Sequence, residues 1–527
     1  MTKRQAQKVT DGINSIDMEN PEFRTLLQMI ENTNQSVFLT GKAGTGKSTF
    51  LRYIIDNSSK QAAVLAPTGI AAVNVGGQTL HSFFRLPLQP VLPEDPEFAP
   101  VKLKSRLNLS SKAIKTFREL DLIIIDEISM VRADMMDLID KILRQFGDKR
   151  RPFGGKQMLL VGDVFQLEPV VTTEDRAILQ LHYKNFFFFN ADVFQSFGLT
   201  SIELRKVYRQ KESEFVGLLD RVRSGMPPVA DIERINTRFR PSDESDNENG
   251  KIILTLAARR DTVTAINNKH LRQLSSPEMI YEGEISGEFP ASAFPTDLNL
   301  CLKEGAQVIF LRNDPERRWV NGTLGIVILA EPKQLRIRLE NGDEHDLDPV
   351  VWENTVYEFD SKSKRVSAII KGSFMQYPVK TAWALTIHKS QGLTFENVDI
   401  NLAGGAFTGG QVYVALSRCT SLDGIRLNTK IDLRDVFVHP EVIRFSHGFN
   451  SQIERERAIA RDKAYKLLTE SDIAFSKGNM QQAVESFSKA LTMNPALNTP
   501  YLRRFIASRL RKISATKNAK TRKTNNK

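Results

Sequence analysis

The segment that most constrains the fold of this chain is a complete phosphate-binding loop, Gly41-Lys42-Ala43-Gly44-Thr45-Gly46-Lys47-Ser48. A short apolar run, 36–40, precedes the loop, and residues 49–55 carry apolar side chains at helical spacing. A strand, a glycine loop and a helix in this order form the context that the motif requires. The glycines let backbone N–H groups surround a phosphate at the positive end of the helix. The sequence therefore predicts that the chain binds a nucleoside triphosphate.

Length and composition narrow the class of protein. A chain of 527 residues exceeds one hydrophobic core and predicts about three to four domains. No apolar run approaches the roughly 20 residues that span a bilayer, and no apolar segment follows Met1–Gln5 as in a secretory signal. The two cysteines, Cys301 and Cys419, indicate neither a disulfide framework nor a cysteine-based metal site. We expect a cytoplasmic protein without a membrane partner.

The net charge of +11 is concentrated at the end of the chain. Residues 501–527 hold ten of the 73 Lys and Arg residues and no Asp or Glu, which leaves 63 basic against 62 acidic residues elsewhere. The excess positive charge therefore belongs to the C-terminal tail, and it does not indicate that the preceding 500 residues bind nucleic acid. Whether this tail anchors nucleic acid or only aids solubility is left open by the sequence.

The apolar runs of the first 165 residues, 36–40, 63–66, 122–125 and 158–161, predict parallel strands of a doubly wound α/β sheet. A second α/β unit is predicted from the runs 201–204 and 252–255, and its pattern resumes near 380. Residues 300–375 alternate apolar and polar positions, with turns at Asn321-Gly322 and Asn341-Gly342. They predict a small antiparallel barrel inserted into the second unit.

These patterns predict four regions. A first domain covers 1–200 with an inserted proline-rich wedge element at 85–115, and a second covers 201–450 with the barrel at 300–378. A helical hairpin similar to a tetratricopeptide repeat (TPR) follows at 451–512, with Gly478 at its turn, and a basic disordered tail at 513–527. One repeat cannot bury its own face. The hairpin is thus either a protein-partner site or a pair of helices docked on the body.

Two acidic residues and a glutamine follow the predicted strands. The run 122–125 ends in Asp126 and Glu127, of which Asp126 can hold Mg²⁺ together with the Ser48 hydroxyl, while Glu127 can orient or deprotonate the attacking water. Lys47 would reach the β- and γ-phosphates, and Gln166 could sense the γ-phosphate. Paired with the loop, these residues favour a hydrolase over a kinase or a slow switch.

Arginines from a second domain can couple hydrolysis to motion, because phosphoryl transfer spreads negative charge over the equatorial oxygens. Arg209 opens the predicted second unit and Arg418 lies near its end. An isolated arginine is usually solvated, so local sequence alone assigns neither one.

The order of further motifs resembles that of superfamily-1B helicases of the Pif (petite integration frequency) branch, with RecD-type relatives. The resembling segments are 66–72 with 77–84 (motif Ia), 126–131 (motif II), 162–167 (motif III), 208–210 (motif IV), 384–392 (motif V) and 413–418 (motif VI). The resemblance covers roughly residues 20–435. It implies two RecA-like domains, an SH3-like barrel inserted in the second, and ATP-driven 5′-to-3′ movement along single-stranded DNA.

The resemblance also implies residue roles. The catalytic set is Lys47, Asp126, Glu127, Gln166, Arg209 and Arg418. The ATP–Mg²⁺ set is Gly41, Ala43, Gly44, Thr45, Gly46, Lys47, Ser48, Thr49, Gln391 and Gly392, with Ser48 and Asp126 as metal ligands. The DNA set is Pro67, Thr68, Gly69, His81, Ser82, Phe83, Thr386, His388, Lys389 and Ser390. Phe83 or Phe84 could stack on a base or belong to the core, and His388 could contact DNA or be a satisfied core histidine.

Two rival functions stay open at this point. A triphosphate-driven switch would hydrolyse ATP without DNA, and a repeat-based adaptor would not depend on Lys47. The helicase prediction names single-stranded, forked and G-quadruplex DNA as partners, a monomer in the absence of DNA, and association with the nucleoid. One departure from the family pattern is Glu168, which stands where many relatives have a second proline; we expect it to perturb the neighbouring loop more than catalysis.

Overall fold

The computed structural model describes residues 19–208, 213–240, 252–360, 365–406 and 408–498, together with Asp17, Lys362 and five positions between 502 and 508. Arg209, the acidic loop at 241–250 and the basic tail at 513–527 lie outside the described residues. Among the helices of the described part, none is long and apolar enough to cross a membrane.

The first α/β unit is built on a parallel sheet of six strands in the order β3-β2-β4-β5-β1-β6. The strands are β1 (Val37–Gly41), β2 (Ala62–Ala66), β3 (Gln78–Thr79), β4 (Leu122–Ile125), β5 (Gln157–Val161) and β6 (Thr200–Leu204). β1, β4 and β5 are buried along their whole length, because helices cover both faces of the sheet. The apolar runs therefore predicted these strands correctly.

The placement of 201–204 in the second unit was wrong. This segment is β6, which pairs with β1 in parallel register, for example Leu39 opposite Ile202. A continuous apolar run indicates a buried strand, but it does not indicate which of two neighbouring sheets the strand joins. The first unit therefore extends at least to Leu204, and the carboxyl end of β6 lies beside the phosphate-binding loop.

Helices on the two faces of this sheet form separate cores. α2 (Pro21–Asn32) and α3 (Lys47–Asn57) pack on one face, whereas α5 (Leu80–Phe84), α7 (Ser111–Glu119) and α8 (Ala133–Phe146) pack on the other. The segment predicted as a wedge contains a 3₁₀ turn, η1 (Pro96–Phe98), and α6 (Leu103–Arg106). Its Phe98 and Leu103 join the core, whereas Leu88 and Val101 are 82% and 86% exposed.

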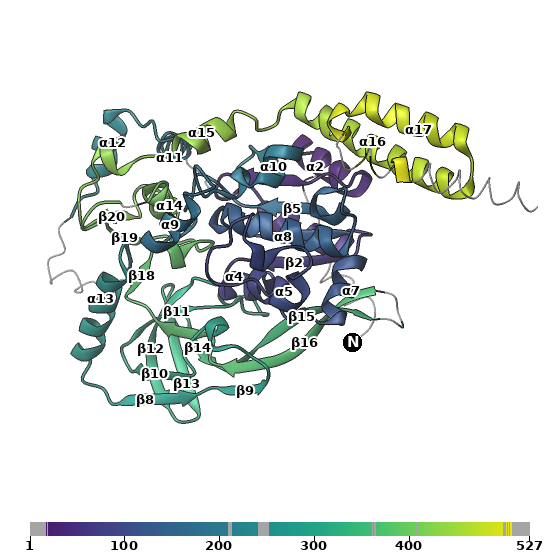
Figure 1. The fold of residues 1–527 in the computed structure, drawn as a ribbon. Coiled ribbons are helices and arrows are strands. Elements are labelled where there is room, and N and C mark those ends of the chain that lie inside the picture. The colour runs from purple at the N-terminus through teal and green to yellow at the C-terminus, as the bar shows by residue number, and fades with distance from the viewer. Residues whose placement is uncertain are drawn as a thin grey trace, which may run out of the picture.

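The second α/β unit has a smaller parallel sheet, in the order β18-β7-β19-β20. Its strands are β7 (Leu254–Ala257), β18 (Ala384–Thr386), β19 (Val398–Asn401) and β20 (Ile425–Leu427), and its helices are α11 (Ser213–Arg223), α12 (Val229–Asn236), α13 (Arg260–Gln273) and α14 (Gln411–Leu416). The fully buried α14 packs against α11. The two α/β units lie side by side in Figure 1.

The insertion between β7 and β18 begins earlier than the predicted 300, at β8 (Glu278–Glu282). A five-stranded antiparallel sheet, β14-β13-β12-β11-β17, forms its centre, and β10-β8 and β15-β16-β9 form two further sheets. The remaining strands are β9 (Glu284–Gly287), β10 (Asn299–Lys303), β11 (Gln307–Phe310), β12 (Leu324–Glu331), β13 (Gln334–Leu339), β14 (Glu344–Leu347) and β17 (Val379–Thr381).

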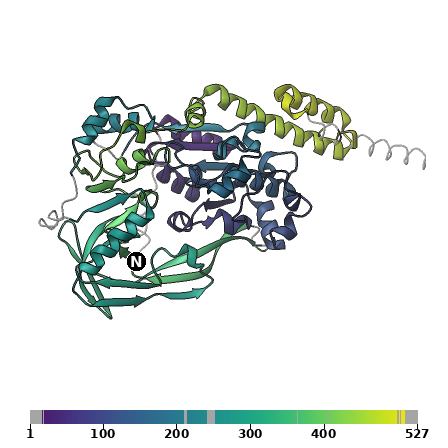
Figure 2. The same ribbon diagram turned by 60° about the vertical axis from the view of Figure 1, so that its left-hand side comes forward.

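A long hairpin of the insertion reaches across to the first unit. It consists of β15 (Val350–Asp360) and β16 (Arg365–Gln376), and its tip lies against α7 (Figures 1 and 2). The Phe359 backbone N–H donates to the Thr116 hydroxyl at 2.9 Å, and the Val366 N–H donates to the Gln61 side-chain oxygen at 2.8 Å. Each α/β unit thus contacts the insertion.

The chain returns to the first unit before residue 450, which corrects the predicted end of the second domain. α15 (Pro440–Ser446) places Phe445 against Phe189, with parallel rings whose centroids lie 4.1 Å apart. α16 (Gln452–Lys477) and α17 (Met480–Met493) then form the predicted helical hairpin, and Gly478 ends α16 with φ 78°. Ala458 is buried in the core of the first unit, while the hairpin projects from the body (Figure 1).

Candidate nucleotide and nucleic-acid site

The phosphate-binding loop lies between the carboxyl end of β1 and the first turn of α3. Gly46 precedes α3 with φ 91°, and a Cβ there would approach the Phe23 ring to 3.2 Å, so the position favours glycine. The Lys47 ammonium donates to the backbone oxygens of Gly41 at 2.6 Å and Lys42 at 3.1 Å. Lys47 therefore lies inside the curve of the loop, beside the N–H groups of the α3 terminus.

Two half-buried carboxylates face this loop from the end of β4. Asp126 follows the strand directly, and Glu127 has φ 51°, with its N–H donating to Asp126 Oδ1 at 2.9 Å. Burial raises the pKa of Asp126. Burial and the Asp126 charge raise the pKa of Glu127 to about 7, against the opposing charges of Lys47 and Arg418. A carboxyl group with this pKa is suited to accept a proton near neutral pH.

The residues present fit a Mg²⁺ ion. Ser48 and Asp126 supply a hydroxyl and a carboxylate on the same cleft, and both are the hard oxygen ligands that Mg²⁺ prefers. The carboxyl groups of Asp126 and Glu127 have raised pKa values, which a nearby divalent cation would offset. Within the described residues, no three His, Cys, Asp or Glu side chains form a self-contained metal site. This suits an ion held partly by substrate phosphates and water.

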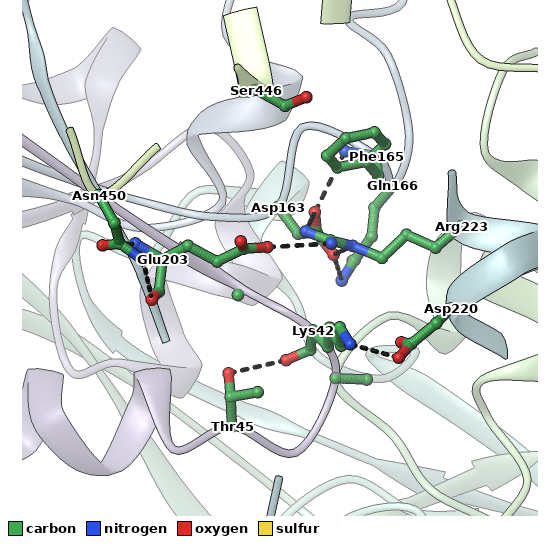
Figure 3. Close-up of polar contacts among 12 residues, drawn as sticks. Lys42, Thr45, Asp163, Phe165, Gln166, Glu203, Asp220, Arg223, Ser446 and Asn450 are labelled. Carbon is green, nitrogen blue, oxygen red and sulfur yellow. Dashed lines mark hydrogen bonds and ion pairs between the residues drawn. The ribbon is translucent and has the colours of Figure 1, made fainter. Parts of the chain in front are cut away.

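The turn after β5 carries Asp163 and Gln166, both buried (Figure 3). Asp163 accepts from the Phe165 N–H at 3.2 Å and from the Gln166 amide at 3.4 Å. The Gln166 amide oxygen accepts from the Gln391 side chain at 3.3 Å, and Gln391 belongs to the second unit. Gln166 therefore lies at the boundary between the two units.

Further contacts join the phosphate-binding loop to the second unit. Lys42 forms an ion pair with Asp220 of α11, and the Ala43 N–H donates to the Tyr413 hydroxyl of α14 at 3.4 Å. Gly410 caps α14 with φ 75°, and a Cβ there would meet the backbone oxygens of Phe165 and Gln166 at 2.2 and 2.3 Å. The turn after β5 therefore packs directly on the N-terminus of α14.

Of the two arginines predicted to act on ATP, only Arg418 lies among the residues that the structure describes. Arg209 lies outside the described residues. Arg418 is only 2% exposed, and its guanidinium donates to the backbone oxygens of Val414, Ser390 and Leu393 at 3.0 to 3.3 Å. Its charge nevertheless lowers the pKa of Glu127, which places it within electrostatic range of the carboxylates.

A single cleft of about 1810 Å³ connects the nucleotide residues with several of the predicted DNA residues. Ser48, Asp126 and Glu127 line it on the side of the first unit, together with Thr68, the N-cap of α4 (Gly69–Asn74). Thr386, His388, Lys389, Gln391 and Gly392 line it on the side of the second unit. Burial lowers the pKa of His388, and the Arg260 charge lowers it further, so the ring is neutral at pH 7.

Other predicted DNA residues do not face this cleft. Phe83 is 6% exposed and packs edge-on against Phe84 with ring centroids 4.8 Å apart, so the base-stacking prediction for Phe83 was wrong and the core interpretation holds. Ser390 is fully buried, and its hydroxyl donates to the Ile387 oxygen at 2.8 Å. The local sequence did not show that Phe83 is buried, because the aromatic contacts that cover its ring come from α7 and β15, which are distant in the sequence.

Four more of the predicted DNA residues do not line the cleft: Pro67, Gly69, His81 and Ser82. Pro67 and Gly69 flank Thr68 at the start of α4, and Ser82 accepts from the Gln78 amide at 2.8 Å. Conversely, Arg259, Arg260 and Arg312 line the cleft and were not predicted. The adjacent arginines Arg259 and Arg260, shortly after the carboxyl end of β7, were the available signal, since the carboxyl ends of parallel strands meet at one edge.

Comparison with known proteins agrees with this geometry. The PIF1-like helicase family model matches residues 20–228. The chain is 31% identical over 440 residues to the ATP-dependent DNA helicase Pif1 of Bdellovibrio bacteriovorus, covering 82% of this chain and 92% of that protein. It is 32% identical over 420 residues to human PIF1, of which it spans 61%.

Solved structures show the same similarity. The Bacteroides Pif1 complex with ADP-AlF4 has a TM-score of 0.75 at 37% identity, covering 82% of this chain and 97% of that one. Bacteroides Pif1 bound to single-stranded DNA has a TM-score of 0.57 at 38% identity, covering 81% and 96%. With its two RecA-like units, its inserted sheets and its C-terminal helices, the chain belongs to the PIF1-like helicases and is an ATP-hydrolysing DNA helicase.

Proposed function

We propose that the protein translocates 5′-to-3′ on single-stranded DNA and unwinds duplex or structured DNA, with Mg-ATP hydrolysed between its two RecA-like units. The observation that carries this proposal is the shared cleft, which is lined by Ser48 and Glu127 of the first unit and by Thr386 and Lys389 of the second. ATP hydrolysis would then displace residues of the same cleft that contacts the DNA strand, so that hydrolysis changes the DNA contacts. The polarity rests on the family resemblance.

In this mechanism the chain's own residues divide the work. The loop N–H groups and Lys47 hold the phosphates, and Glu127 accepts the proton of the attacking water. Gln166 orients that water from the boundary between the units. Bound Mg²⁺ would neutralise phosphate charge beside Ser48 and Asp126. Closing the units would bring Arg209 and Arg418 toward the phosphates and would alter the groups that hold the strand.

The cations of the cleft suit a strand bound without regard to sequence. Arg260, Arg312 and Lys389 supply positive charge, and Thr68 and Thr386 supply hydroxyl groups. Such groups contact phosphates and position the strand, whereas base edges carry the sequence information. We propose forked and G-quadruplex DNA as substrates, with Leu88 and Val101 of the wedge element meeting the junction. We also propose a cytoplasmic location with the nucleoid, where the DNA of a bacterial cell lies.

The direct test is ATP hydrolysis with and without single-stranded DNA, for the wild type and Lys47→Ala. The proposal expects strong stimulation by DNA, binding that weakens as salt rises, and no hydrolysis by Lys47→Ala. Hydrolysis that is equal with and without DNA would instead favour the triphosphate-driven switch. A biological effect that survives Lys47→Ala would favour the adaptor, with the α16–α17 hairpin as its partner site.

A further inference from the structure

The most connected ion pair at the boundary between the two units is made by Arg223, the last residue of α11. Its Nη2 donates to Asp163 Oδ1 at 2.9 Å, its Nε donates to Asp163 Oδ2 at 3.2 Å, and its Nη1 donates to Glu203 Oε1 at 3.1 Å (Figure 3). The guanidinium also lies over the Phe165 ring, 4.3 Å from its centroid. Each guanidinium nitrogen therefore has a partner in the first unit.

Burial makes these contacts specific. The side chains of Arg223 and Asp163 are 8% and 0% exposed, so the carboxylate depends on the arginine for its compensating charge. Burial lowers the pKa of Arg223, but the charge and hydrogen bonds of Asp163 together with the charges of Tyr413 and Glu203 raise it above its ordinary value, so the guanidinium stays charged. A planar fork that binds a carboxylate through two nitrogens fixes both the distance and the orientation of that group. Arg223 thus determines where the Asp163 carboxylate lies.

Asp163 in turn holds the turn that carries Gln166. It accepts from the Phe165 N–H and the Gln166 amide, while the other end of that amide contacts Gln391. The same cluster lies close to the phosphate-binding loop, because the charges of Asp163 and Arg223 both act on the Lys47 ammonium. A displacement of α11 relative to β5 would therefore move the Gln166 side chain.

The second acceptor is also fixed by the surrounding structure. Glu203 lies in β6, next to β1, and its backbone N–H and oxygen pair with the Asn450 side chain at 3.0 and 2.9 Å. Asn450 lies in the segment that returns to the first unit (Figure 3). Arg223 therefore binds to a rigid edge of the first sheet, while it is itself carried by a helix of the second unit.

We propose that Arg223 is a positioning residue, which acts through Asp163 to hold Gln166 in its hydrolytic arrangement only when the two units are correctly placed. The inference rests on the proposed function, because it assigns Gln166 a role at the γ-phosphate or the attacking water. It makes Arg223 distinct from Arg209 and Arg418, which are expected to reach the phosphates themselves. Arg223 would transmit the spacing of the units without touching ATP.

The test compares Arg223→Gln, Arg223→Lys, Gln166→Ala and the double variant Arg223→Gln/Gln166→Ala in full-length protein. Arg221→Gln is the matched control, since Arg221 lies on the same helix and pairs with Asp231, but its side chain is 47% exposed. For each variant we measure kcat and KM for ATP with single-stranded DNA, and the melting temperature.

We expect Arg223→Gln to lower kcat by roughly tenfold to a hundredfold. The KM for ATP should change by less than about threefold, because the phosphate-binding loop is untouched. Arg223→Lys keeps the charge but not the fork, so it should melt near the wild-type temperature and still have a lowered kcat. Arg221→Gln should behave as the wild type.

The double variant decides the route of action. If Arg223 acts through Gln166, the kcat of the double variant equals that of the slower of the two single variants. The inference would be overturned if the reductions in kcat of the two single variants multiply in the double variant, or if Arg223→Lys has the wild-type kcat. Should Arg223→Gln not fold, Arg223→Lys in the same cycle gives the answer. A wild-type protein without DNA-stimulated hydrolysis would refute the proposed function instead.

Discussion

ATP hydrolysis should depend on one group that ionises near pH 7, the carboxyl of Glu127. Burial and the neighbouring Asp126 raise its pKa to about 7. A base with this pKa is about nine-tenths ionised at pH 8 and about one-tenth ionised at pH 6. We therefore expect kcat/KM for ATP, which reports the free enzyme, to fall roughly tenfold between these pH values. Steady-state hydrolysis at saturating single-stranded DNA measures it.

Two variants identify the group. Glu127→Gln should lose about two or more orders of magnitude in rate, because it removes the proton acceptor. His388→Asn should keep the inflection near pH 7, because burial already lowers the pKa of His388 below its ordinary value. A rate that does not change between pH 6 and pH 8 in the wild type, or an inflection that vanishes in His388→Asn, would refute the assignment to Glu127.

Three further predictions concern stability and packing. The folded-state pKa of Glu127 lies above its ordinary 4.5, so its contribution to stability is present at low pH and is lost as pH rises toward and through 7. Glu127→Gln should remove this loss, roughly 3 kcal/mol, from the pH dependence of denaturant unfolding. Phe445→Ala should lower the free energy of unfolding by roughly 2–3 kcal/mol, since Phe445 stacks on Phe189. Phe437→Ala, at a 41% exposed position, should lower it by about 1 kcal/mol or less. Equal losses in the two variants would contradict the docking of α15. Gly410→Ala should slow hydrolysis because its Cβ would meet the Phe165 and Gln166 backbone, while Gly478→Ala, with a similar φ and nothing within 4 Å, should leave the ATPase rate unchanged.

The nucleotide side of the cleft could be predicted because its signals are local. The phosphate-binding loop and Asp126-Glu127 follow an apolar strand directly, and Gln166 follows one after a short turn. Parallel strands bring their carboxyl ends to one edge. The helical hairpin after residue 451 was also predicted, since apolar periodicity and Gly478 mark two helices and a turn. These features require no knowledge of distant contacts.

The features that were missed depend on tertiary neighbours. Arg223 looks like any arginine at the end of an amphipathic helix until the Asp163 and Glu203 carboxylates are placed around it. The strand 200–204 is equally apolar in either sheet, and only its pairing with β1 decides the matter. Phe83 lies in a segment that resembles a DNA-binding motif, but its ring packs in the core against Phe84 and Phe117.

Glu168, where the sequence departs from the family pattern, contacts the second unit. The Glu168 carboxylate accepts from the Gly409 N–H of the second unit. The expected effect of this departure on the neighbouring loop stays a prediction. Burial raises the pKa of this carboxyl group. Glu168 thus forms another link between the units.

The central claim is that ATP hydrolysis drives this protein along a strand in one direction. The most direct measurement is unwinding of a labelled duplex that carries only a 5′ tail or only a 3′ tail, with ATP and Mg²⁺, and with Lys47→Ala as the inactive control. The account predicts strand separation from the 5′-tailed duplex alone, and none by Lys47→Ala. Separation from the 3′-tailed duplex alone would contradict the direction, and separation from neither would contradict the motor.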